Sequence, residues 1–179
     1  MPGKKLCLVL ALTCGSSAAG VSRHTRRATP QAMGVAFGTV GLITIAPQSV
    51  TFQARNPEAG TVASSSPASL SWVVSSGSHA LNWTVSIQAT DSSFSNCPTL
   101  PVSAVRVNCS SASVSGGSGT GSCSGSFPLS ATLQQLAGGV QGDAVNTYTV
   151  TISFTLAESW RYIAKSSCTL NLTYSINAQ

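Results

Sequence analysis

Hydrophobic and polar residues alternate along residues 81–90, which read Leu-Asn-Trp-Thr-Val-Ser-Ile-Gln-Ala-Thr. Every second residue is apolar, and each residue between them carries a hydroxyl or amide group. A period of two gives an extended strand one apolar and one polar face, whereas a helix requires a period near 3.6. We therefore predict a strand here, with one face buried against a partner surface and the other in solvent.

The same alternation predicts further strands. Residues 148–156 and 168–176 are the longest of them, and residues 69–75 are a shorter case. The loop at 76–79 leads directly into the strand at 81–90, so we predict that residues 69–75 pair with that strand as a hairpin.

Proline, glycine and serine mark the predicted interruptions. Residues 41–46 and 49–54 are separated by Pro47, which cannot donate to a strand ladder, so a sheet edge or a switch between sheets is expected there. Residues 91–98 are expected to be a loop before a strand at 100–109. The Gly/Ser-rich residues 115–125 are expected to be flexible, and Gly138-Gly139 to mark a turn.

About seven to nine such strands predict an all-β fold, an antiparallel two-sheet sandwich that is immunoglobulin-like in the broad sense. Composition supports this class. Only 7% of the residues are charged, so the helix-favouring Glu, Lys and Arg are scarce. β-Branched residues, which favour strands, are plentiful.

The N-terminus has the pattern of a secretory signal. Lys4 and Lys5 precede a short apolar run at residues 6–13, and Ser17-Ala18-Ala19 offers a small-residue cleavage site. The apolar run is too short to span a bilayer. We predict a signal peptide at 1–19 and a secreted or cell-surface location for the mature chain, with no transmembrane segment.

Residues 20–38 are predicted to be a flexible basic arm, and residues 39–179 a single β-sandwich domain. The formal net charge is +5. The predicted domain balances four basic against four acidic residues: Arg55, Arg106, Arg161 and Lys165 against Glu58, Asp91, Asp143 and Glu158. A nucleic-acid-binding domain should carry a basic stripe, so no nucleic-acid partner is expected. The arm is either disordered or an interaction tail for acidic envelope polymers.

Four cysteines remain after removal of the predicted signal: Cys97, Cys109, Cys123 and Cys168. An even number in an exported chain favours two disulfides, for which three pairings can be formed. In one of them Cys109–Cys123 closes the Gly/Ser loop and Cys97–Cys168 joins the middle of the chain to its last strand. A metal site is the rival interpretation, but the cysteines lack zinc-site spacing.

Candidate chemistry is sparse, so we expect no enzyme, cofactor or metal. The histidines outside the predicted signal are His24 and His79, and serine-nucleophile, zinc-protease and phosphate-loop motifs are missing from the sequence. His79 is interpreted as a solvated loop residue rather than a catalytic base. Trp160 and Tyr162 fall outside the regular alternation and are candidates for glycan contact; burial in the core is the alternative for them.

Part of the chain, roughly residues 81–177, resembles the WxL-type domains of bacterial surface proteins. The resemblance is carried, in order, by Asn82-Trp-Thr-Val-Ser-Ile-Gln-Ala-Thr-Asp-Ser-Ser-Phe94, Leu100-Pro-Val-Ser-Ala-Val105, Gln134-Gln-Leu-Ala-Gly-Gly139, Tyr148-Thr-Val-Thr-Ile152 and Leu170-Asn-Leu-Thr-Tyr-Ser-Ile176. The resemblance implies an exported β-rich module that associates non-covalently with the cell wall.

The expected function is therefore that of a secreted, non-catalytic cell-envelope protein that binds a cell-wall polymer or surface glycan. The alternative is a pilin-like or spore-coat-like fibre subunit that self-associates by strand exchange, with residues 41–54 as a candidate donated strand.

Overall fold

The computed structural model describes residues 6–13, 44–54, 60–74, 82–142, 146–159 and 167–178. Among these residues it contains strands and a short 3-10 helix, η2 (Val102–Ala104), but no α-helix. The strands are β1 (Leu6–Thr13), β2 (Thr44–Ala46), β3 (Ser49–Ala54), β4 (Thr61–Ala63), β5 (Ala68–Val74), β6 (Asn82–Ala89), β7 (Ser93–Phe94), β8 (Cys97–Pro101), β9 (Val105–Ser115), β10 (Thr120–Cys123), β11 (Ser126–Pro128), β12 (Gln134–Val140), β13 (Asn146–Ala157) and β14 (Ser167–Ala178).

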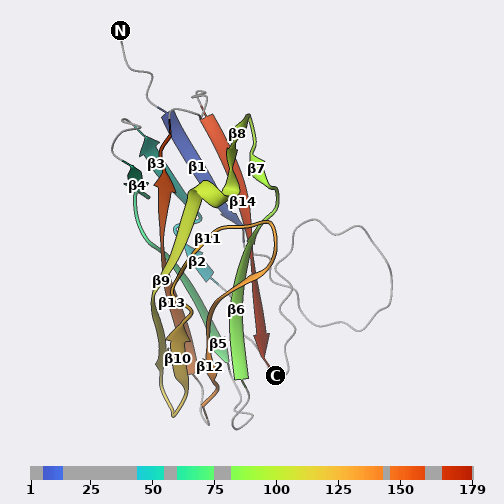
Figure 1. Cartoon of the computed structure of the whole chain (residues 1–179). Helices are drawn as coiled ribbons and strands as arrows, with labels where there is room; N and C mark the ends of the chain where they lie inside the picture. Colours follow the sequence, from blue (N-terminus) through green and yellow to red (C-terminus); the bar gives the residue numbers. More distant parts are fainter. Residues whose placement is uncertain are drawn as a thin grey trace.

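Two sheets pack face to face in an elongated sandwich (Figure 1). Sheet A has the strand order β10-β12-β6-β14-β1-β3, and sheet B the order β11-β9-β13-β5-β2, with β4 also pairing with β13. The described pairs are antiparallel except for β1 with β14. The predicted all-β, antiparallel sandwich is thus confirmed.

Strand alternation is confirmed where the sequence shows it best. In β6 the buried residues are Trp83, Val85, Ile87 and Ala89, and the residues between them are less buried. In β13 and β14 the apolar residues from Tyr148 to Leu156 and from Cys168 to Ile176 are buried in the same way. Each strand buries one face because the opposite sheet covers it.

The prediction that residues 69–75 form a hairpin with residues 81–90 is wrong. β5 lies in sheet B, between β13 and β2, whereas β6 lies in sheet A, between β12 and β14. Their apolar faces meet across the core, where the rings of Trp72 and Trp83 lie 5.4 Å apart. Two strands that face each other through their side chains cannot also share a ladder.

The interruption at Pro47 is a switch between sheets, one of the two alternatives expected from the sequence. β2 pairs with β5 in sheet B, β3 pairs with β1 in sheet A, and the Ala46–Pro47 peptide bond between them is cis. Residues 41–54 are the range suggested as a donated strand. Within this range, β2 and β3 belong to the chain's own sheets B and A. Residues 41–43 lie outside the described residues.

Four local predictions are corrected. The expected loop at 91–98 contains β7 and the start of β8, and the expected strand at 100–109 is interrupted by η2. Gly138 and Gly139 do not form a turn but lie in β12, beside β6. The Gly/Ser-rich segment 115–125 turns at Gly116 and Gly117, which have positive φ, and then forms β10.

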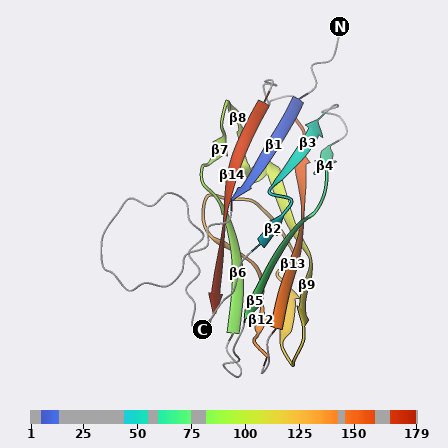
Figure 2. The same cartoon turned by 180° about the vertical axis from the view of Figure 1, so that it is seen from behind.

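Residues 6–13, expected as the core of a secretory signal, form strand β1. Figures 1 and 2 show this strand between β3 and β14 at one end of sheet A. Leu8 pairs with Cys168 on one side and with Phe52 on the other, and Leu10 with Leu170 and Val50. The four partner residues are buried.

Candidate functional site

The outer side of sheet B carries hydroxyl groups on three adjacent strands. We call this surface the hydroxyl face and define it by Ser69 and Ser71 of β5, Thr147, Thr149, Thr151, Ser153 and Thr155 of β13, and Ser111, Ser113 and Ser115 of β9. The three serines of β9 are exposed, and the residues on β5 and β13 are partly exposed. A twisted sheet spaces such side chains about 6.6–6.8 Å apart along a strand and about 4.8 Å apart between strands.

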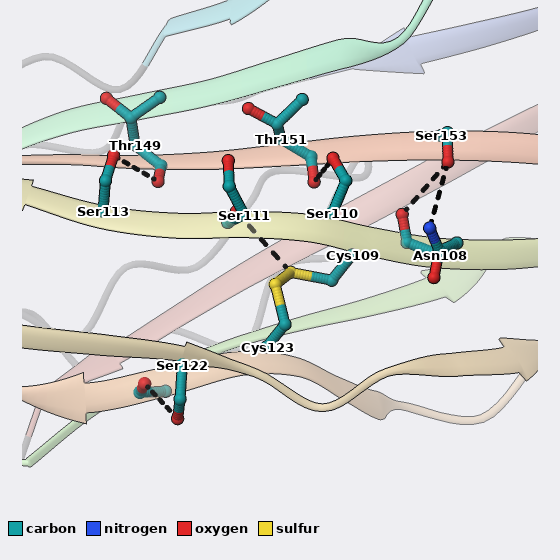
Figure 3. The surroundings of a disulfide bond; sticks show 11 residues. Asn108, Cys109, Ser110, Ser111, Ser113, Ser122, Cys123, Thr149, Thr151 and Ser153 are labelled. Atoms are coloured by element: carbon teal, nitrogen blue, oxygen red, sulfur yellow. Dashed lines mark hydrogen bonds between the residues drawn. A yellow bond between two sulfur atoms is a disulfide. The ribbon is translucent and has the colours of Figure 1, made fainter.

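A β-bulge in β9 extends this surface. Val105, Val107 and Cys109 are buried, and the register then shifts, so that Cys109 pairs with Ile152 but Ser111 with Thr151. The extra residue, Ser110, reverses the inward and outward positions that follow. Both Ser110 and Ser111 are therefore exposed, and the hydroxyl of Ser110 donates to the carbonyl of Thr151 at 3.2 Å (Figure 3).

Hydroxyls on this face donate to the neighbouring backbone. Ser113 Oγ lies 3.5 Å from the carbonyl oxygen of Thr149, and Ser115 Oγ lies 3.3 Å from that of Thr147. A hydroxyl has one donor and two acceptor sites, so a serine whose hydrogen is directed to a carbonyl still offers lone pairs outward. The exposed edge of the face on β9 is hence an array of hydrogen-bond acceptors.

Charge on the face is low. Asp91, Arg106 and Glu158 are the charged residues within the described ranges. Arg106 of β9 lies at the end of the face, where Nε donates to Ser126 Oγ at 3.4 Å. Within the described residues, the hydroxyl face therefore offers little charge to attract a ligand.

The disulfides have the pairing considered from the sequence, Cys97–Cys168 and Cys109–Cys123. Cys109 lies on β9 of sheet B and Cys123 on β10 of sheet A, so this bond joins the two sheets behind the hydroxyl face (Figure 3). The Cys97–Cys168 disulfide joins the start of β8 to the start of β14. The cysteines thus serve the fold and hold the bulged part of β9 against its partner sheet.

Metal-binding side chains are not clustered in the described part of the chain. No group of three or more His, Cys, Asp or Glu residues there could hold a metal ion. The candidate glycan-contact residues Trp160 and Tyr162, and also His79, lie outside the described residues.

From the sequence, the threonines of residues 147–155 are recognisable only as the polar positions of a strand. Their signal is the run Thr-x-Thr-x-Thr-x-Ser-x-Thr, with Ser-x-Ser-x-Ser at 111–115. The pairing of the two runs could not be predicted, because it depends on the bulge at Ser110.

None of the described residues forms a helix long and apolar enough to cross a membrane. The chain matches no protein-family model, and a comparison with curated proteins gives no match. The resemblance to WxL-type domains therefore stays a prediction.

Proposed function

We propose that this chain is a secreted, non-catalytic protein of the cell envelope whose β-sandwich associates with a cell-wall polymer or surface glycan. The observation that supports the proposal best is the hydroxyl face, an extended and nearly uncharged array of hydroxyl groups on a disulfide-linked sandwich. Disulfides form and persist in oxidising compartments, which agrees with export.

The chemistry of the face suits a polysaccharide. Sugar hydroxyls donate and accept hydrogen bonds, and the serines of β9 direct their own hydrogens to the backbone, which leaves acceptors for an incoming donor. An extended polymer can follow the strands and make several weak contacts at once. Each hydrogen bond contributes about 0.5–1.5 kcal/mol net, so affinity comes from their number.

The test is co-sedimentation of the exported protein with purified cell-wall sacculi and with insoluble polysaccharides. The variant carries Thr149→Val and Thr151→Val, which remove two hydroxyls and keep a β-branched shape. We expect about tenfold weaker binding or more. The matched control is Thr173→Val on the outer side of sheet A, where binding should be unchanged.

Two further measurements separate this face from the other candidates. Binding by the hydroxyl face should change little with salt, whereas attachment of Arg23, Arg26 and Arg27 to an acidic polymer should weaken steeply as salt rises. Trp160→Ala tests the aromatic candidates. The proposal fails if neither sacculi nor polysaccharides retain the wild-type protein at low salt.

A fibre subunit assembled by strand exchange is the second candidate. The observation that favours it is the position of β1, because a strand inserted between β3 and β14 could also come from a neighbouring copy. Concentration-dependent assembly of the exported protein would support this role.

A further inference from the structure

The position occupied by β1 is a place where sheet A can receive a separate strand. β1 forms seven registered pairs with β14 and six with β3, while β3 and β14 do not pair with each other. If the predicted signal is removed at residue 19, both neighbours lose this ladder. Each is then left with unpaired N–H and C=O groups, which form a template for a new strand.

We call the gap between β3 and β14 the slot. Its lining determines which strand sequences it can accept. The residues that face β1 in register and are buried are Val50 and Phe52 on β3, and Cys168, Leu170 and Leu172 on β14. A strand placed here presents alternate residues to the core. The slot therefore selects an extended segment with apolar residues at every second position.

The acceptor strand β14 is anchored independently of β1. The Cys97–Cys168 disulfide fixes its beginning, Ser95 and Thr169 form a bridge, and residues from Leu172 onward pair with β6. These contacts do not involve β1. The slot can thus persist while its occupant changes.

A segment with the required pattern lies between the predicted cleavage site and β2. Residues 31–38 read Gln-Ala-Met-Gly-Val-Ala-Phe-Gly, with large apolar residues at 33, 35 and 37 and small residues between them. Aligned residue by residue with 6–13, these three positions coincide with Leu8, Leu10 and Leu12, whose register partners are buried.

We propose that the slot is a strand-binding site and that, once the leader has been removed, residues 31–38 of the same chain occupy it, parallel to β14. The inference goes beyond association with a cell wall and does not depend on it. It does depend on removal of the leader. In this scheme Leu6–Thr13 holds the slot in the unprocessed chain and the first part of the mature chain replaces it.

The length of the connection favours the chain's own segment. Position 13 lies two residues beyond the Ala11–Ser49 pair and is therefore level with Pro47. Thr44 lies three residues beyond Pro47, which corresponds to about 10 Å along the strand direction. It also belongs to the other sheet, and packed sheets are about 10 Å apart. Residues 39–43 provide six Cα steps, or about 20 Å, which exceeds the roughly 14 Å required. A tether that can span its site gives a high effective concentration, so the chain's own segment outcompetes that of a second copy.

The experiment uses the full chain exported from a secreting host. Mass spectrometry identifies the N-terminus, light scattering gives the size in solution, and hydrogen exchange follows the amides of residues 50–52 and 168–172. We expect a processed monomer in which these amides are protected. Phe37→Asp should make them exchange at least tenfold faster, with β13 unaffected. The matched control Ala36→Asp places the same charge at the alternate position and should retain the protection.

Other results overturn the proposal. A product that still contains residues 6–13, or a processed monomer whose slot amides are unprotected, shows that residues 31–38 do not fill the slot. Protection that appears only in concentration-dependent assemblies assigns the slot to a second copy. If Phe37→Asp is not exported, Phe37→Ala is used with the same readout. All of these measurements are made without cell wall, so their outcome is separate from that of the sedimentation assay.

Discussion

The indole of Trp83 in sheet A meets the phenol ring of Tyr148 in sheet B edge-on, with the ring centroids 5.5 Å apart and the planes at 70°. Trp72 completes the cluster by stacking on Tyr148 at 5.3 Å. The indole N–H of Trp83 donates to the carbonyl of Thr120 at 3.0 Å, so its polar atom is also satisfied. Three residues from β5, β6 and β13 thus join the two sheets through ring contacts.

Removal of this ring should be costly. Trp83 is 2% exposed, and Trp83→Ala would leave a cavity between the sheets and leave the Thr120 carbonyl without its donor. We expect a loss of about 3–5 kcal/mol in the free energy of unfolding, measured by urea denaturation. Leu133→Ala is the control, because Leu133 is 55% exposed and should change stability by less than about 0.5 kcal/mol. A loss below about 1 kcal/mol for Trp83→Ala would contradict its role in the core.

Glycine at position 139 allows β10 and β12 to approach Trp83. A Cβ on Gly139 would overlap the carbonyl of Thr120 and lie 2.9 Å from Cε2 of Trp83. We expect Gly139→Ala to lower the unfolding free energy by about 3 kcal/mol or more, at or above the usual upper end for overpacking, because backbone blocks the added methyl group.

Gly60→Ala provides the comparison for Gly139→Ala. Gly60 has φ +81° and nothing within 4 Å of an added Cβ, so only backbone strain of about 1–2 kcal/mol is expected. Thermal or urea unfolding of both variants shows which substitution lowers the free energy of unfolding more. Equal losses would show that the close approach at Gly139 does not matter.

The sequence predicts the strands that bury one face and expose the other. In β6, β13 and β14 one face is buried, so apolar residues must occur at every second position, and this pattern can be recognised in the sequence. The two-sheet class follows, because several such strands need a common core. The break between β2 and β3 at Pro47 is also predictable, because proline cannot donate to a strand ladder, but the sequence leaves open whether the break marks a sheet edge or a switch between sheets.

Partner choice could not be predicted. Alternation shows that β5 has a buried face, but not whether β6 lies beside it or across the core. Gly138 and Gly139 suggest a turn by composition; their place in β12 depends on the Trp83 ring, which is distant in sequence. The hydroxyl face requires a register that shifts at Ser110, and the shift is set by pairing with β13.

Hydrogen exchange should be slowest in β13. This strand pairs with β9 over most of its length and on its other side with β5 and β4, whereas β11 and β10 lie at the edges of their sheets. Amides paired within a buried central strand exchange only through large openings, while edge strands fray. We expect the amides of Val150, Ile152 and Phe154 to exchange at least a hundredfold more slowly than those of β11, as measured by mass spectrometry or NMR. Comparable rates would contradict β13 as the centre of sheet B.

The two disulfides should differ in their contribution to stability. Cys97–Cys168 joins residues 71 apart in sequence, and Cys109–Cys123 joins residues 14 apart. A crosslink restricts the unfolded chain more when it closes a longer loop; loops of about 15 and 100 residues correspond to about 3 and 4.7 kcal/mol. Replacing both cysteines of Cys97–Cys168 by alanine should therefore cost about 1 to 1.5 kcal/mol more than the same change at Cys109–Cys123.

Urea denaturation of the two double variants measures that difference, with the wild-type protein as the reference. Cys97 and Cys168 are each 1% exposed, whereas Cys109 is 6% exposed and Cys123 is only partly buried, so any cavity left by alanine is larger at Cys97–Cys168 and acts in the same direction as the loop length. The opposite order would mean that the bond between the sheets stabilises the native state beyond its loop length. The bulged part of β9 would then depend on that bond, and the Cys109–Cys123 variant should also lose binding at the hydroxyl face in the sedimentation assay.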